Sequence, residues 1–82
     1  MLVRPNPAQE FAEIEYETTE SGRTQLYLIN ALGETAMWLV NGEVAKGRKV
    51  IQLNIDEIKS GAYFLIMKTT TQVRSVRVDV VK

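Results

Sequence analysis

The fold of this chain is decided by residues 58–67, which read IKSGAYFLIM. They hold the longest unbroken apolar run of the sequence, Ala62–Met67, directly behind the turn-forming pair Ser60-Gly61. Six apolar residues bounded by turn residues are typical of a strand that is buried on both faces, and a helix of that length would be unusually short. We therefore predict a central strand here, with the other segments packed around it.

The sequence on either side of this segment reads as further strands separated by turns. We predict a short strand near Val3, strands over Phe11–Thr18, Gln25–Ala31, Thr35–Val40 and Lys49–Ile55, and a closing strand over Val76–Val80. The expected turns are Thr19–Arg23, Asn30–Glu34 with a positive φ at Gly33, Asn41-Gly42, Asp56–Lys59 and Thr69–Thr71. Ile58 is expected to plug the core from the turn that contains it.

Short strands joined by turns, with no convincing amphipathic helix, indicate an all-β fold. We predict an immunoglobulin-like, seven-stranded antiparallel β-sandwich, for which turns about every 8–12 residues are typical. A small open barrel is the alternative, and periodicity does not separate the two.

Three glutamates alternate with apolar residues along Phe11–Thr18, which predicts one wet face and one buried face. Neighbouring glutamates on one side of a strand lie about 7 Å apart. That is too far for two of them to share a metal ion without ligands from other strands. We therefore interpret them as a solvated face and not as a metal site: Glu13, Glu15 and Glu17.

Met37 and Trp38 are adjacent large apolar residues in a predicted strand. Because successive side chains of a strand point to opposite faces, either one of them lies on the outer face or the strand is bulged at this point. Trp38 is the only tryptophan. We interpret it as core packing or a local surface cover, with a binding platform as the alternative.

Length and composition bound the possible functions. Eighty-two residues form one small domain, and without cysteine no disulfide can stabilise it. No apolar stretch approaches the roughly 20 residues that span a bilayer. The N-terminal segment lacks the hydrophobic core of a signal peptide, so we expect any signal for export to lie elsewhere on a longer polypeptide.

The charges balance overall but not along the chain. Ten basic and ten acidic residues give a net charge of zero, which argues against nucleic acid as the main partner. Residues 1–41 carry a net charge of −4 and residues 42–82 a net charge of +4. We expect the two halves to lie side by side as strands of complementary charge; the alternative is a basic C-terminal edge that docks to a receptor.

The residue types that most enzymes need are missing. Without histidine or cysteine, the serine–histidine and cysteine–histidine nucleophiles and the usual zinc sites are excluded. The five glycines lie singly in turns and form no phosphate-binding loop. Asp56-Glu57 is a pair of carboxylates with no supporting acid or base. We therefore predict a protein that is not an enzyme, with no catalytic residue, metal or cofactor.

Six stretches in order carry a resemblance to a known family. They are Pro5–Ala8, Ile14–Tyr16, Leu28–Gly33, Leu39–Gly42 with Gly47-Arg48, Ile58–Leu65 and Val78–Lys82. Together they resemble the type A C-terminal sorting domain of the Bacteroidetes type IX secretion system, from about residue 3 to the last residue. Two positions depart from the usual pattern, Ala36 in place of a larger aliphatic residue and Leu53 in place of an aromatic one; we expect both to alter core filling.

The resemblance implies that residues 1–82 are a single C-terminal module of a larger cargo protein. The cargo would pass through the periplasm and then cross the outer membrane, to reach the cell surface or the medium. The implied partners are the outer-membrane translocon, a shuttle protein and a sortase-like protease that removes the domain. The positions that match the family motif are Pro5, Asn6, Pro7, Gly33, Gly61, Tyr63, Val80, Val81 and Lys82.

The closing strand suggests how such a domain could be recognised. Its valines are expected to fill the core, while its backbone edge, with Arg74 and Arg77 beside it and Lys82 at its end, could be read by strand addition. The same edge could pair with a second copy of the chain, so a homodimer is also possible.

Two other functions remain open at this point. A related immunoglobulin-like module of the flagellar hook-cap type shares the motif style of Asn30–Gly33 and Gly61–Tyr63. A carbohydrate-binding or fibronectin-like accessory domain would need an exposed aromatic platform, for which Trp38, Tyr27 and Phe11 are the candidates.

Overall fold

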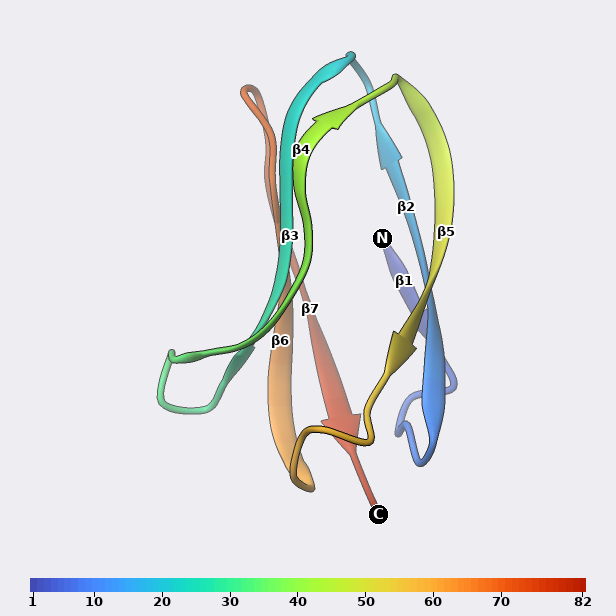
Figure 1. Cartoon of the computed structure of the whole chain (residues 1–82), viewed down its shortest axis with the longest axis vertical. Helices are drawn as coiled ribbons and strands as arrows, with labels where there is room; N and C mark the ends of the chain where they lie inside the picture. The colour runs from blue at the N-terminus through green and yellow to red at the C-terminus, as the bar shows by residue number, and fades with distance from the viewer.

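The computed structural model describes residues 1–82 and contains seven strands (Figure 1). The strands are β1 (Leu2–Arg4), β2 (Phe11–Thr18), β3 (Gly22–Asn30), β4 (Thr35–Val44), β5 (Gly47–Asn54), β6 (Gly61–Lys68) and β7 (Val73–Val80). The chain has no helix that is long and apolar enough to cross a membrane.

The strands form two sheets that pack face to face. One sheet has the order β1-β2-β5 and the other the order β4-β3-β6-β7, and every pair of neighbouring strands is antiparallel. The predicted β-sandwich is therefore confirmed, and the chain is not a barrel. In immunoglobulin constant domains the fourth strand joins the sheet of the first, second and fifth strands. Here β4 lies beside β3 on the other sheet.

The core lies between the sheets and is built by alternation along each strand. On β2 the inward side chains Ala12, Ile14, Tyr16 and Thr18 are buried while the glutamates face outward, as predicted. The closing strand β7 likewise buries Val78 and Val80. The fifteen core residues are Val3, Ala8, Ala12, Ile14, Tyr16, Leu26, Leu28, Leu53, Ile55, Ile58, Tyr63, Leu65, Met67, Val78 and Val80.

The strand predicted to be central, β6, is central within its sheet but is not buried on both faces. It lies between β3 and β7, and Tyr63, Leu65 and Met67 point into the core. Phe64, however, is 38% exposed on the other side. The prediction was wrong on this point because all seven strands belong to the two sheets. No third layer is left to cover the outer face of β6.

Strand β4 is longer and less regular than predicted. The pair Asn41-Gly42, expected to be a turn, continues the ladder opposite Thr24 and Gln25, and the chain turns at residues 45–46 instead. The Asn41 side chain is used across the strands, because its Oδ1 accepts a hydrogen bond of 2.7 Å from Arg23 Nη2. Tertiary pairing thus outweighs the local turn preference of the dipeptide.

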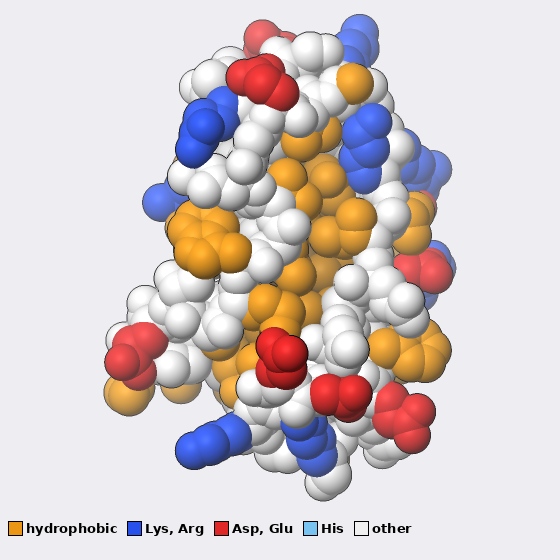
Figure 2. All heavy atoms as spheres, viewed as in Figure 1, with side chains coloured by type: hydrophobic (Ala, Val, Ile, Leu, Met, Phe, Trp, Pro, Cys, Tyr) orange, Lys and Arg blue, Asp and Glu red, His pale blue; other side chains and the backbone are white.

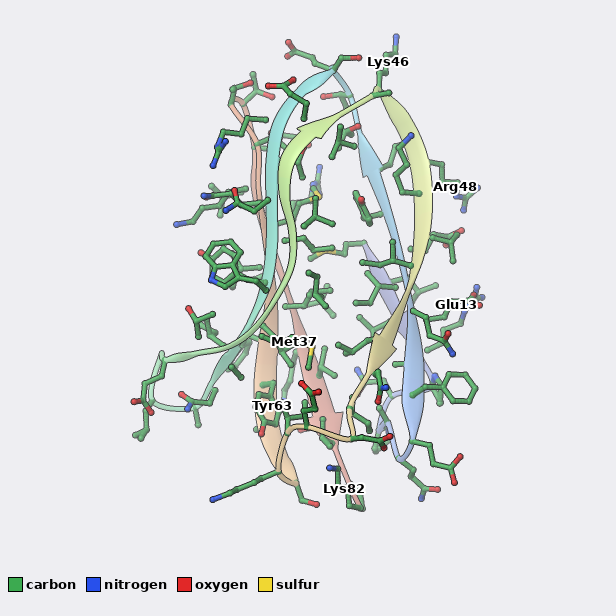
Figure 3. The ribbon with its side chains drawn as sticks, in the orientation of Figure 1. Glu13, Met37, Lys46, Arg48, Tyr63 and Lys82 are labelled. Atoms are coloured by element: carbon green, nitrogen blue, oxygen red, sulfur yellow. The ribbon has the colours of Figure 1, made fainter.

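The bulge expected near Met37 and Trp38 is present. The β3–β4 register shifts twice, so that Leu39 and Ala36 have no partners opposite them. Trp38 lies on the outer face, 51% exposed, and packs against Tyr27 with ring centroids 4.7 Å apart and ring planes tilted by 42°. Met37 points between the sheets (Figure 3). Ala36 is exposed and fills no core, contrary to expectation, because it is a bulge residue.

One side of the sandwich is more open than the other. On one side, β1 and β7 contact each other across the two sheets. On the other side, β4 and β5 leave a strip of apolar side chains visible between them (Figure 2). We call this strip the lateral seam; its residues are Met37, Leu39, Val40 and Ile51, which are partly buried against the core.

Ion pairs join neighbouring strands at the surface. Arg48 Nη2 on β5 lies 2.8 Å from Glu15 Oε1 on β2, and Arg4 Nη2 on β1 lies 3.5 Å from Glu13 Oε1. Figure 3 shows Glu13 and Arg48 on the outer side of the β1-β2-β5 sheet. Only the Arg48 pair links the acidic half of the sequence to the basic half, so charge complementarity between the halves is a minor contribution, because exposed pairs stabilise little.

Leu65→Ala tests the placement of β6. Leu65 is fully buried, so we expect its truncation to lower the free energy of unfolding by about 2–5 kcal/mol through lost burial and the cavity left behind. Phe64→Ala, one position along on the exposed face, is the matched control and should cost much less. Urea denaturation of the three proteins measures both values; equal losses would contradict the one-sided burial of β6.

Tyr16 predicts a pH dependence of stability. Burial raises the pKa of its phenol above the usual 10.0. The unfolded chain then loses this proton first, so the contribution to stability is complete below pH 10 and declines as the pH rises toward the folded pKa. We expect the free energy of unfolding to fall more steeply above pH 10 in the native protein than in Tyr16→Phe. Parallel curves in urea denaturation would refute this.

Candidate recognition surface at the C-terminal edge

The loop between β1 and β2 is hydrogen-bonded to the last strand. Both of its prolines follow cis peptide bonds, and Asn6 lies between them. The Asn6 side chain donates from Nδ2 to the carbonyl oxygen of Arg77 at 2.9 Å and accepts at Oδ1 from the N–H of Asp79 at 3.0 Å. An amide side chain can do this because it carries a donor and an acceptor side by side, as the backbone does.

Ala8 continues this pairing toward the end of the chain. Its N–H donates to the carbonyl oxygen of Asp79 at 2.8 Å, and its carbonyl accepts from the N–H of Val81 at 2.9 Å. Ala8 thus forms a parallel bridge with Val80, and its side chain is completely buried. We call the four hydrogen bonds made by Asn6 and Ala8 the loop clip.

The loop clip corrects the expectation of an open edge on the closing strand. β7 is the outermost strand of its sheet, as predicted. Residues 77–81, however, already use their outward-facing backbone groups to bind the loop. An added strand would have to displace the loop here, because each backbone N–H and C=O is satisfied once. Strand addition and dimerisation at this half of β7 are therefore blocked.

The tail beyond β7 is also held in place. The N–H of Lys82 donates to Ser60 Oγ at 3.0 Å, and its Nζ donates to the carbonyl oxygen of Asp56 at 3.0 Å. The tail is thereby attached to the loop between β5 and β6. Val81, the residue before Lys82, is 49% exposed.

Tyr63 fixes the same β5–β6 loop from inside. Its ring is buried at the beginning of β6, and its hydroxyl donates to the carbonyl oxygen of Lys59 at 2.6 Å. The loop also contains the predicted turn, in which the N–H of Ile58 donates to the carbonyl of Ile55 and Ile58 is buried. Figure 3 shows Tyr63 and Lys82 at the same end of the sandwich.

The structure thus gathers most of the predicted motif positions into one surface, which we call the C-terminal edge. Its exposed residues are Pro5, Asn6 and Pro7 in the loop, Gly61 at the start of β6, and Val81 and Lys82 in the tail. Tyr63 and Val80 lie buried beneath them. That a partner recognises these residues remains a prediction.

Gly33 does not belong to this surface. It lies in the β3–β4 hairpin with φ 84°, as the turn requires. Asn30 organises that hairpin, because its Oδ1 accepts from the N–H groups of Leu32 and Glu34 at 3.0 Å each. Gly33 therefore serves the geometry of the β3–β4 turn, away from the C-terminal edge.

Sequence reasoning missed the backbone groups that the C-terminal edge binds. Arg77, Asp79, Asp56 and Lys59 take part through backbone groups, which no side-chain pattern reveals. Ser60 acts through its hydroxyl, but its position before a glycine indicated only a turn.

Two depressions flank the loop clip. One, of about 400 Å³, is lined by Pro5, Pro7, Gln9, Glu10 and Phe11. The other, of about 460 Å³, lies beside the tail and is lined by Gln9, Glu10, Asp56, Val81 and Lys82. Because they share Gln9 and Glu10, the two depressions form one hollowed margin around the C-terminal edge.

The aromatic platform considered for carbohydrate binding is not assembled. Tyr27 and Trp38 stack on the outer face of the four-stranded sheet. Phe11 lies on β2 in the other sheet. The three rings therefore do not share a face.

Comparison with protein families agrees with the resemblance in the sequence. The model of a family described as the secretion system C-terminal sorting domain matches residues 2–82. The chain belongs to this family. Comparison with curated proteins and with solved structures finds no match in either. As a sorting domain of type IX secretion cargo, it serves as a secretion signal and not as an enzyme, and its cargo is secreted through that system.

Asn6→Ala tests whether the loop clip holds the last strand. The substitution removes two hydrogen bonds, so we expect the free energy of unfolding to fall by about 1–3 kcal/mol. Hydrogen exchange at the Asp79 amide should accelerate as well, because its acceptor is lost. Asn41→Ala, which removes an exposed amide that binds only Arg23, is the control and should leave Asp79 exchange unchanged. Unchanged exchange in both variants would refute the clip.

Proposed function

We propose that residues 1–82 form the C-terminal sorting domain of a larger cargo protein, and that the secretion machinery recognises its closed C-terminal edge. On this proposal the cargo crosses the periplasm, is passed by a shuttle to the outer-membrane translocon, and reaches the cell surface or the medium. A sortase-like protease then removes the domain.

The observation that carries the proposal is the connection between the two ends of the chain. Asn6 and Ala8 hold β7, and Lys82 is held by the β5–β6 loop. Positions far apart in the sequence therefore lie together at one preformed end of the sandwich. Such a surface suits recognition, because a partner need not order the tail when it binds.

The backbone of residues 77–81 is already paired, which favours reading of side chains over strand addition. Val81 offers an exposed apolar side chain, and Lys82 offers a cation beside the depression that also contains Glu10 and Asp56. A receptor that fits this margin would combine an apolar contact with a charged one.

A secretion assay tests the proposal. A signal peptide and a fluorescent protein are placed ahead of residues 1–82 and expressed in a bacterium that has this secretion system. Val81→Ala/Lys82→Ala removes the exposed side chains of the tail, and Val73→Ala/Lys46→Ala is the matched surface control. We expect the native and control fusions to be exported. The tail variant should show a drop of about tenfold, equivalent to about 1.4 kcal/mol of lost recognition.

The outcomes distinguish a failure of the sorting function from a failure of the proposed recognition surface. Retention of the native fusion in the periplasm would contradict the sorting function proposed for these residues, provided that circular dichroism shows the domain to be folded. Export of native and tail variants to the same extent would keep that function and reject the tail as the recognised surface.

A further inference from the structure

The two sheets present four outermost strands, and three of them are protected against pairing. Unpaired edge strands are ready templates for another strand, so proteins shorten, bend or cover them. β1 has only three residues. β4 is bulged twice, at Ala36 and Leu39. β7 is closed over residues 77–81 by the loop clip.

β5 is not short, bulged or covered by another segment, and its one inward-facing charged residue is Lys49, near its start. Its eight residues, Gly47–Asn54, pair with β2 in an unbroken register with no bulge and no proline. No backbone group of residues 48–53 takes part in a hydrogen bond outside that ladder. In Figure 1, β5 forms the margin of its sheet, and no other segment lies along its open edge.

The lateral seam opens beside this edge. Met37, Leu39 and Val40 from β4 and Ile51 from β5 are only partly buried against the core. Figure 2 shows apolar side chains along this opening. A strand added to β5 would therefore gain backbone hydrogen bonds and at the same time approach apolar side chains.

The charges along β5 are arranged so that the strand complements itself. Lys46, Arg48 and Lys49 stand at its beginning, while Asp56 and Glu57 follow its end. When such a strand lies antiparallel to a copy of itself, the basic end of each meets the acidic end of the other. Self-complementarity of this kind is what a two-fold symmetric interface requires.

We propose that β5 pairs with β5 of a second copy of this chain, antiparallel and centred on Gln52. Directly opposed residues of an antiparallel pair point to the same face, which a two-fold axis through one residue satisfies. Within β5, residues 50–54 of the two copies then pair, with Ile51 opposite Leu53 of the second copy. Arg48 of each copy comes near the turn that carries Asp56 of the other. The exposed part of Arg48, whose side chain is 68% accessible, remains free for this contact.

The pairing joins two sheets into one. The combined sheet runs β1-β2-β5-β5-β2-β1, and its only remaining edges are the short β1 strands. The second copy stands on the side where the lateral seam opens, so the seam of each copy is covered. An extended segment of another protein could use the same edge, but it would lack the self-complementary charges.

The central residue gives a test that depends on the register. Gln52 faces itself across the two-fold axis, so Gln52→Lys places two cations in direct opposition and Gln52→Glu places two anions. Lysine at position 52 also lies opposite Glu13 on β2, so the fold tolerates it. Gln72→Lys, in the turn between β6 and β7, makes the same chemical change far from β5 and is the matched control.

Sedimentation velocity over a concentration series supplies the readout. We expect the native protein and Gln72→Lys to approach twice the monomer mass of 9.3 kDa as concentration rises. Gln52→Lys and Gln52→Glu should each stay monomeric, and an equimolar mixture of the two should dimerise again, since lysine then faces glutamate.

Three results would overturn the proposal. The native protein could stay monomeric at the highest concentration, which would leave β5 free for a different partner. Gln52→Lys could dimerise as the native protein does, which would place the contact elsewhere. A mixture of the two charged variants that remained monomeric would reject the register centred on Gln52.

Discussion

The pair of hydrogen bonds between the Asn6 amide and the backbone of β7 is the contact on which the shape of the C-terminal edge depends. It joins residues separated by 71 and 73 positions in the sequence. Through it the first loop of the chain becomes an extra, partial strand on the last strand. Ala8 can then bury its side chain and bond to both sides of Val80. Without that amide, the carbonyl of Arg77 and the N–H of Asp79 would have no partner on the edge of β7.

Much of the sandwich follows from patterns in the sequence. Alternation along Phe11–Thr18 and Val76–Val80 is enough to assign strands with one buried face, because each strand meets only one partner sheet. The weaker cases have a common origin in tertiary context. Asn41-Gly42 is a turn signal in isolation but lies in a ladder with β3. The apolar run Ala62–Met67 gives no indication that one face of its strand is uncovered.

Sequence reasoning named several side chains of the candidate site but not its geometry. The resemblance supplied Asn6, Tyr63 and Lys82 as motif positions. What these side chains bind are backbone carbonyl and N–H groups of other segments, and every residue carries those groups. A sequence therefore cannot single them out. The expectation of an open closing edge failed for the same reason, since nothing in residues 5–8 signals that they lie beside β7.

The order in which the loop clip can form has a consequence for synthesis in the cell. Asn6 leaves the ribosome long before Arg77 and Asp79. The carbonyl and the N–H that its amide binds are therefore not yet synthesised when the first strands emerge. Contacts over such long separations in sequence are slow to close, and β7 must be present before β6 is flanked on both sides. A translation product that stops short of β7 has no loop clip and no anchored tail. The C-terminal edge is therefore complete only after the last strand has been synthesised.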